Sequence, residues 1–387
     1  MRATAKPAIL RLDSLTGLRF PAALAVFAFH TALPELPLLR DAALQGDYYR
    51  AVSQAGGAGV TFFFVLSGFV IAWSARETDS PPAFWRRRFV KILPLYYITC
   101  ALAVFVMHLH DFSLRKTVLY LAMLQVWVPD YPLNFAVNAP GWSLAAEGFF
   151  YLVFPALMLG LVRLHRRGLW IALAATLFVE LAIPAVSGLL PMGGQRLTNE
   201  PAVSGVQYWF DYVFPPTRIP DFLVGMILAR LVRFHQFPRI RFRLAIPTLI
   251  VGYLLALNIP VLYGQRVALI VPCALLITAA AQCDLAGAPS VLRARIPVLL
   301  GEISFAFYLI HFSVLHFLNV YLLHGPSDSP QAIAVYFLLA LAITLPLSWL
   351  AFTWIELPLV RAWGGRTVRG FRGVETVSPA TEHVGVR

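Results

Sequence analysis

Long apolar runs dominate the sequence and restrict the chain to one class of fold. Of the 387 residues, 59% are hydrophobic and only 13% are charged, and the mean hydropathy is +0.72, which is outside the range of water-soluble domains. A helix needs about 17 to 25 mostly apolar residues to cross a bilayer. Allowing for ragged ends, ten runs qualify, so we predict an all-α, polytopic membrane protein with about ten transmembrane helices. The predicted spans are residues 15–33, 55–75, 92–109, 142–164, 169–190, 219–232, 244–262, 267–281, 298–318 and 333–357.

An eleventh apolar run, residues 118–128, decides the topology. As a helix it would rise about 16 Å, too little for a hydrocarbon core of about 30 Å. If it does not span and both termini are cytoplasmic, only seven of the 31 lysines and arginines lie outside; if it spans, this bias largely disappears. Basic residues collect in cytoplasmic loops. We therefore predict a plasma-membrane protein with cytoplasmic N- and C-termini, in which this run is re-entrant or interfacial, covered by protein or lining a wet cavity.

Residues 1–362 are predicted to form one membrane domain, because no polar loop is long enough to have a core of its own. Residues 363–387 are rich in glycine, arginine and small polar residues, which predicts a disordered, basic cytoplasmic tail. The net charge of +12 lies in short clusters between apolar runs and is not the footprint of nucleic-acid binding. The three cysteines, Cys100, Cys273 and Cys283, have no paired spacing, so we predict neither a disulfide framework nor a zinc site.

The first predicted span carries two polar residues, Arg19 and His30, eleven positions apart. Eleven residues are about three helical turns, so both side chains lie on one face, about 16 Å apart along the axis. Each would be costly against lipid, so this face is expected to point into the protein or into water. The alternative is that Arg19 reaches the headgroups and His30 is a hydrogen-bonded core residue.

Further polar residues fall at membrane depth on other spans: Glu147, Arg218, Asp221 and His311. The predicted orientation places Glu147 just inside the outer end of its span, at a depth similar to that of His30. A carboxylate beside a histidine can hold one imidazole tautomer and raise its basicity, as a general base requires. Two alternatives stay open: Glu147 could pair with an arginine to specify packing, and His311 could be a satisfied core histidine.

A cluster of cations, Arg86, Arg87, Arg88 and Lys91, lies in WRRRFVKILP at the inner mouth of the third span. Such clusters are ordinary topology signals. Their close packing below the face shared by Arg19 and His30 also suits a polyanion with bidentate oxygens, such as a nucleotide phosphate. The sequence has no Walker loop, no GxSxG elbow, no HExxH and no CxxC. The candidate site is therefore the group of polar residues at membrane depth, and not a linear motif of a soluble enzyme.

The order of several segments resembles the membrane-bound acyltransferase 3 family over nearly the whole chain. The segments are LDSLTGLRFPAALAVFAFH, GVTFFFVLSGFVIAW, FWRRRFVKILPLYY, PGWSLAAEGFFYLVFP, RIPDFLVGMILA, LGEISFAFYLIHF and WIELPLVR. The resemblance implies transfer of an acyl group from acyl-CoA to a hydroxyl, usually on a sugar. Members of the family that acylate peptidoglycan often have an additional hydrolase-like domain. This sequence is more similar to stand-alone members, which favours a macrolide antibiotic as acceptor over a cell-envelope saccharide.

Three motifs of this family fall on identifiable residues. The motif of an arginine, ten residues and a histidine falls on Arg19 and His30, which implies that His30 is catalytic. The motif of two arginines separated by two residues falls on Arg88 and Lys91, where lysine keeps the charge but not the bidentate fork. The signature of tryptophan, serine, leucine and glutamate falls on Trp142, Ser143, Leu144 and Glu147.

The first hypothesis is therefore an O-acyltransferase whose acyl-CoA enters from the cytoplasm. Its phosphates would be bound by Arg87, Arg88 and Lys91. Arg19 would line the path along which the thioester reaches His30. No metal or bound cofactor is required, and acyl-CoA is a co-substrate.

In the same hypothesis Glu147 orients His30, which accepts the proton of the acceptor hydroxyl. The second hypothesis is a transporter or flippase that uses the polar cavity as a substrate path, which predicts inverted halves and broken helices. The residues expected to line the acceptor side of the cavity are Trp142, Ser143, Arg218, Asp221 and His311.

Overall fold

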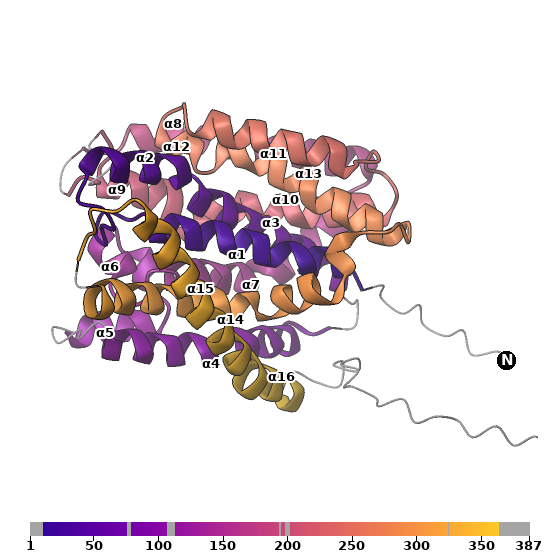
Figure 1. The fold of residues 1–387 in the computed structure, drawn as a ribbon. Coiled ribbons are helices and arrows are strands. Elements are labelled where there is room, and N and C mark those ends of the chain that lie inside the picture. Colours follow the sequence, from indigo (N-terminus) through magenta and orange to yellow (C-terminus); the bar gives the residue numbers. More distant parts are fainter. Residues whose placement is uncertain are drawn as a thin grey trace, which may run out of the picture.

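The computed structural model describes residues 11–75, 79–106, 113–192, 195–197, 202–323 and 325–363. These residues form helices joined by loops, with isolated bridges at Leu39–Ser327 and Arg196–Ser204 and no β-strand (Figure 1). The predicted tail, from residue 364 onward, lies outside the described residues. The long helices are α1 (Asp13–Thr31), α2 (Ala42–Val52), α3 (Ala55–Ser74), α4 (Pro81–Val106), α7 (Gly141–Val162), α8 (Arg166–Gly188), α10 (Pro215–Arg233), α11 (Phe242–Ala256), α13 (Val267–Leu285), α14 (Arg295–Phe317) and α15 (Gln331–Ala351). The short segments are α5 (Leu114–Leu121), η1 (Gln125–Trp127), α6 (Tyr131–Phe135), α9 (Gly205–Tyr208), η2 (Trp209–Val213), α12 (Val261–Gly264), η3 (Val291–Arg293), η4 (Leu318–Leu322), η5 (Phe352–Glu356) and α16 (Leu357–Trp363).

A helix occupies each of the ten predicted spans, which confirms an all-α, polytopic membrane protein. Three of these helices are not both long and apolar enough to cross a membrane by themselves. The helix α11 has only 15 residues, and charged residues interrupt α1 and α10. The number ten therefore stays a prediction. Within the residues that the structure describes, seven helical segments are long and apolar enough to cross a membrane: Ala42–Ser74, Pro81–Val106, Gly141–Val162, Arg166–Gly188, Val261–Leu285, Arg295–Leu322 and Gln331–Trp363.

The centre of the molecule is built by α1 and α3, with α14 against α1 and α10 against α3 (Figure 1). Two glycines allow α3 and α10 to cross at very short range. A Cβ atom at Gly68 would lie 1.9 Å from the carbonyl oxygen of Phe222, and one at Gly225 would lie 1.9 Å from that of Val65. Such an approach of two backbones is characteristic of small residues at helix contacts in membranes.

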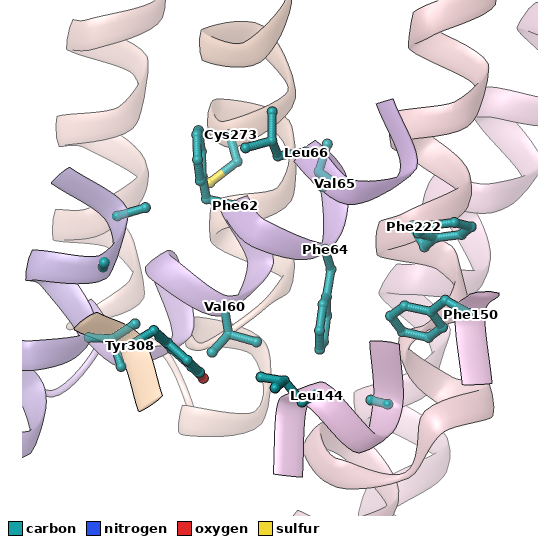
Figure 2. Packing of buried hydrophobic residues seen from close by; sticks show 14 of the residues in the cluster. Val60, Phe62, Phe64, Val65, Leu66, Leu144, Phe150, Phe222, Cys273 and Tyr308 are labelled. Atoms are coloured by element: carbon teal, nitrogen blue, oxygen red, sulfur yellow. The ribbon is translucent and has the colours of Figure 1, made fainter. Parts of the chain in front are cut away.

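Aromatic side chains fill the space beside this crossing. The Phe64 ring on α3 lies edge-on to Phe150 on α7, with centroids 5.0 Å apart, and Phe150 stacks on Phe222 of α10 at 5.2 Å. Figure 2 shows these rings next to α3, and it shows Cys273 of α13 near Phe62 and Leu66. This packing joins α3, α7 and α10 into one core.

Loops that were predicted to share a side of the membrane contact one another. Leu39 pairs with Ser327, and the Trp209 indole donates a hydrogen bond to the Val126 carbonyl on the side predicted to be outside. On the opposite side, Arg11, which precedes α1, pairs at 2.9 Å with Glu302 in the first turns of α14. The alternation of the predicted spans thus agrees with the fold, while their orientation across the membrane stays a prediction.

The run at residues 118–128 is divided between α5 and η1, so no helix there is long enough to span. The segment is tied to α4, because the Tyr96 hydroxyl donates to the Tyr120 carbonyl at 3.0 Å. In turn the Tyr120 hydroxyl donates to the Leu133 carbonyl at 2.8 Å. Protein contacts therefore satisfy part of its irregular backbone, as expected for a non-spanning segment at this depth.

Candidate active site

A cavity of about 370 Å³ lies between α1, α3, α4, α7 and α14. Its lining on α3 extends from Val60 to Ser74, about 21 Å along the helix axis. Most of the wall is apolar, with Leu15, Phe64 and Leu144 among its residues. The cavity is thus a long, mostly apolar channel into which a few polar groups project.

Three predicted donor-binding cations, Arg19, Arg88 and Lys91, line this cavity together. The Arg88 guanidinium lies over the Phe84 and Tyr151 rings, at 5.5 and 6.0 Å from their centroids. These stacking contacts hold its planar fork in a fixed orientation. The structure therefore gathers the cations from α1 and α4 at one end of a shared space.

Arg87 does not line the cavity and instead pairs with Asp79 at 2.7 Å. Lys91 has Glu356 of η5 as its ion-pair partner, with the Nζ and Oε1 atoms 4.0 Å apart. Both ion pairs are partly exposed at α4, near the predicted inner mouth. Of the predicted donor residues, Arg87 is therefore the one that the fold directs elsewhere.

Glu147 also lines the cavity, but its partners differ from the prediction. Its Oε1 atom accepts hydrogen bonds from the Ser67 and Tyr151 hydroxyls, both at 2.6 Å. The expected contact between Glu147 and His30 is wrong, because Glu147 lines the cavity and bonds to Ser67 and Tyr151, whereas His30 lies outside the lining. Glu147 is six residues into α7, about 9 Å from its start, whereas His30 is the penultimate residue of α1.

The partner of His30 is His311 of α14. The Nδ1 atom of His30 lies 2.8 Å from the Nε2 atom of His311, and the Nδ1 atom of His311 lies 3.1 Å from the Phe307 carbonyl oxygen. Both rings are buried, and the Phe312 ring packs edge-on against His30.

The hydrogen bonds determine the tautomers of this histidine pair. A carbonyl oxygen only accepts, so the Nδ1 atom of His311 carries a proton. In a neutral His311 ring the Nε2 atom is then an acceptor, and the Nδ1 atom of His30 must be the donor. A neutral His30 therefore has its free lone pair on Nε2, the atom that points away from His311. This is the protonation state that a general base requires.

Comparison with known proteins identifies the family of the chain. The model of the acyltransferase 3 family, described as an acyltransferase domain, matches residues 12–353, from α1 to η5. The chain belongs to this family. Of the two hypotheses, this confirms the membrane acyltransferase over the transporter.

Relatives of the acyltransferase include two named enzymes. Acyltransferase MdmB of Streptomyces mycarofaciens is 34% identical over an alignment of 388 positions, which covers 97% of each chain. Peptidoglycan O-acetyltransferase OatA of Listeria monocytogenes is 26% identical over 178 residues, 41% of this chain and 26% of OatA. No solved structure matches the chain.

Two residues predicted for the acceptor side of the acyltransferase, Trp142 and Ser143, have different surroundings. Ser143 lines the cavity, and its Oγ atom lies 2.8 Å from the Tyr308 hydroxyl. Trp142 lies outside the lining and packs against Tyr212, with ring centroids 4.9 Å apart. Its neighbour Tyr212 contacts Tyr208 in turn, so Trp142 joins an aromatic cluster.

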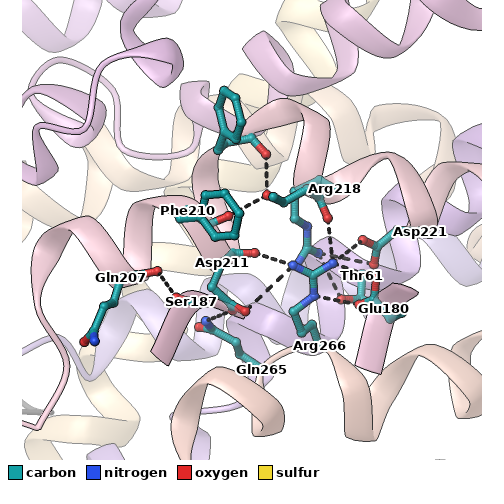
Figure 3. A network of polar contacts seen from close by, with 12 residues as sticks. Thr61, Glu180, Ser187, Gln207, Phe210, Asp211, Arg218, Asp221, Gln265 and Arg266 are labelled. Atoms are coloured by element: carbon teal, nitrogen blue, oxygen red, sulfur yellow. Dashed lines mark hydrogen bonds and ion pairs between the residues drawn. The ribbon is translucent and has the colours of Figure 1, made fainter. Parts of the chain in front are cut away.

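The predicted acceptor residues Arg218 and Asp221 also lie outside the cavity lining, in a buried ionic network (Figure 3). Arg218 donates to Asp221 at 3.3 Å, and Arg266 makes two hydrogen bonds of 2.6 Å to Glu180. Asp211 accepts from Arg266 through its carbonyl oxygen, and burial raises the pKa of its carboxyl to about 6, against the effect of Arg266. The network ties α8, α10 and η2 together, since buried charges require partners of this kind.

Three residues that sequence reasoning did not select complete the cavity: Ser67, Tyr151 and Tyr308. Hydroxyls on helices commonly bond to their own backbone, so their presence in apolar runs gave no specific signal. Glu180 and Arg266 were not selected from the sequence either, although a charged residue within an apolar segment predicts a buried partner.

Proposed function

We propose that this acyltransferase moves an acyl group from acyl-CoA to a hydroxyl of a sugar-containing acceptor. The observation that carries the proposal is the hydrogen-bond chain from His30 through His311 to the Phe307 carbonyl. It leaves Nε2 of His30 free to accept a proton. Family membership supplies the reaction class, and the histidine pair supplies the general base.

The chemistry follows from this tautomer. The acceptor hydroxyl gives its proton to Nε2 of His30 while its oxygen attacks the thioester carbonyl carbon, which forms the C–O bond. The C–S bond then breaks, and the thiolate of CoA takes the proton from the imidazolium. His311 accepts a hydrogen bond from His30 throughout and so stabilises the positive charge in between. General base catalysis of this kind contributes roughly 10² to 10⁴ in rate.

The cavity supports acyl-CoA as the donor. Arg19, Arg88 and Lys91 share one space, and their side chains could bind phosphate oxygens, with Arg88 offering a bidentate fork. The apolar wall toward Val60 and Leu144 would accept the less polar arm that carries the thioester. Glu147 has both of its hydrogen bonds within the cavity wall, so we assign it a role in shaping the channel beside Arg88.

The acceptor and the topology belong to the same proposal. We place both termini and the cationic end of the cavity in the cytoplasm, with His30 toward the outer face of the plasma membrane. A sugar hydroxyl is supported by similarity to a peptidoglycan O-acetyltransferase and by the resemblance to stand-alone members that acylate macrolide sugars. A macrolide glycoside is the preferred acceptor, and an envelope saccharide is the second.

The test is acyl transfer by membranes that contain the protein. Membranes are incubated with labelled acetyl-, propionyl- and isovaleryl-CoA and with either a sugar-bearing macrolide or purified peptidoglycan fragments, and the acceptors are examined by mass spectrometry. The proposal predicts a mass increase of one acyl group on the sugar that is absent with membranes lacking the protein. Transfer from no acyl-CoA to either acceptor would overturn it.

A further inference from the structure

The cavity ends before it reaches the histidine pair. On α1 its lining stops at Arg19, and on α14 it stops at Tyr308; neither His30 nor His311 lines it. Along α1 the lining ends about 16 Å before His30, whereas along α14 it ends only three residues before His311. An acyl group carried by a donor that is anchored at the cations must therefore pass the side chains that close this end.

Tyr308 is held firmly at that position. The Ser143 hydroxyl donates its single proton to the Pro140 carbonyl at 3.0 Å, so in the 2.8 Å contact the Tyr308 hydroxyl is the donor and the Ser143 Oγ atom the acceptor. The Phe63 ring lies edge-on against the Tyr308 ring, with centroids 5.8 Å apart. Only 6% of Tyr308 is exposed, so both its hydroxyl and its ring are fixed.

Tyr308 also lies beside the histidine pair, because it lines the cavity and its ring contacts the His311 ring. It precedes His311 by three residues on α14, and the centroids of the two rings are 6.0 Å apart. Figure 2 shows Tyr308 beside Val60 and Leu144, which line the same end of the cavity. Because α14 supplies both residues, the tyrosine cannot move far along the helix axis without displacing the histidine pair.

We propose that Tyr308 closes the cavity toward His30 and determines the largest acyl group that can pass. The inference rests on the proposed function, since it concerns the route of the acyl thioester. A short acyl chain passes the ring with little displacement. A longer or branched chain requires the ring to swing aside, which breaks the hydrogen bond to Ser143 and disturbs the contact with Phe63.

The test is the ratio of kcat/KM for isovaleryl-CoA to that for acetyl-CoA, with whichever of the two acceptors the wild-type protein acylates. Tyr308→Ala is expected to raise this ratio by about tenfold or more, the range in which pockets distinguish added methylenes. Tyr308→Phe keeps the ring and removes only the hydrogen bond, so it is expected to raise the ratio by about two- to tenfold. Phe305→Ala is the matched control, because Phe305 lines the same cavity from the same helix, one turn farther from His311.

The control ratio is expected to stay within about twofold of the wild-type ratio, since discrimination of added methylenes belongs to the narrow end. A ratio unchanged in both Tyr308 variants, or shifted equally by Phe305→Ala, would overturn the inference while acyl transfer itself continued. If Tyr308→Ala does not accumulate, the Tyr308→Phe ratio decides. Absence of transfer by the wild-type protein would instead remove the proposed function and the inference with it.

Discussion

His311 gives the sharpest prediction about how the site works. His311→Leu removes the acceptor for the Nδ1 proton of His30 while it keeps an apolar side chain in the space that α14 buries. The imidazolium that forms on His30 during transfer then loses a hydrogen bond to a charged group, worth about 1.5 to 3 kcal/mol. Because this bond strengthens as the charge develops, its loss falls on kcat, which we expect to drop by about 10- to 150-fold.

His311→Gln is the matched control for that substitution. The end of a glutamine side chain reaches the position of the imidazole Nε2 atom, and its carbonyl oxygen can accept the hydrogen bond from His30. We therefore expect His311→Gln to restore most of the lost kcat. The assay is acyl transfer on membranes normalised for folded protein, measured over a range of pH. If His311→Leu retained wild-type kcat, or if glutamine were as harmful as leucine, the assignment of the tautomer would be refuted.

Three further predictions concern the donor site, the packing and the topology. Lys91→Gln should raise the KM for acyl-CoA about tenfold, or about 1.4 kcal/mol, with a smaller effect on kcat. Lys91→Arg should keep or lower the KM, and an unchanged KM in Lys91→Gln would exclude Lys91 from the donor site. Gly225→Ala should lower the stability in detergent by about 1 to 3 kcal/mol because its Cβ would meet a backbone oxygen of α3, while Gly160→Ala, with no atom within 4 Å, should not; equal thermal stability of the two variants would contradict this account of the crossing. Membrane-impermeant thiol labelling of intact cells should modify Ser329→Cys and not Arg166→Cys, both exposed positions, and the reverse pattern would invert the proposed topology.

The helical fold and several of the residues that line the cavity could be predicted from the sequence. The spacing of Arg19 and His30 placed both on α1, a helix enclosed by other helices, as the cost of charge in lipid requires. The run at residues 118–128 was predicted not to span, and its longest helix has eight residues. These results depend on length, hydropathy and helical period, which are local properties of the chain.

The partner of His30 could not be predicted, because it depends on where helices begin and how they are rotated. Glu147 was predicted to lie near the outer end of its span and to orient His30, but the partner of His30 is His311, and Glu147 bonds to Ser67. Likewise, Arg218 faces Asp221 and the network of Arg266 instead of the cavity, because the rotation of α10 brings them together. Neither depth nor rotation follows from hydropathy alone.

The central claim, that His30 is the general base, is tested most directly by the rate of acyl transfer in His30→Ala membranes. The account predicts that this variant inserts and accumulates like the wild type and that its kcat falls by roughly 10² to 10⁴. Transfer at a near-normal rate by a folded His30→Ala protein would contradict it.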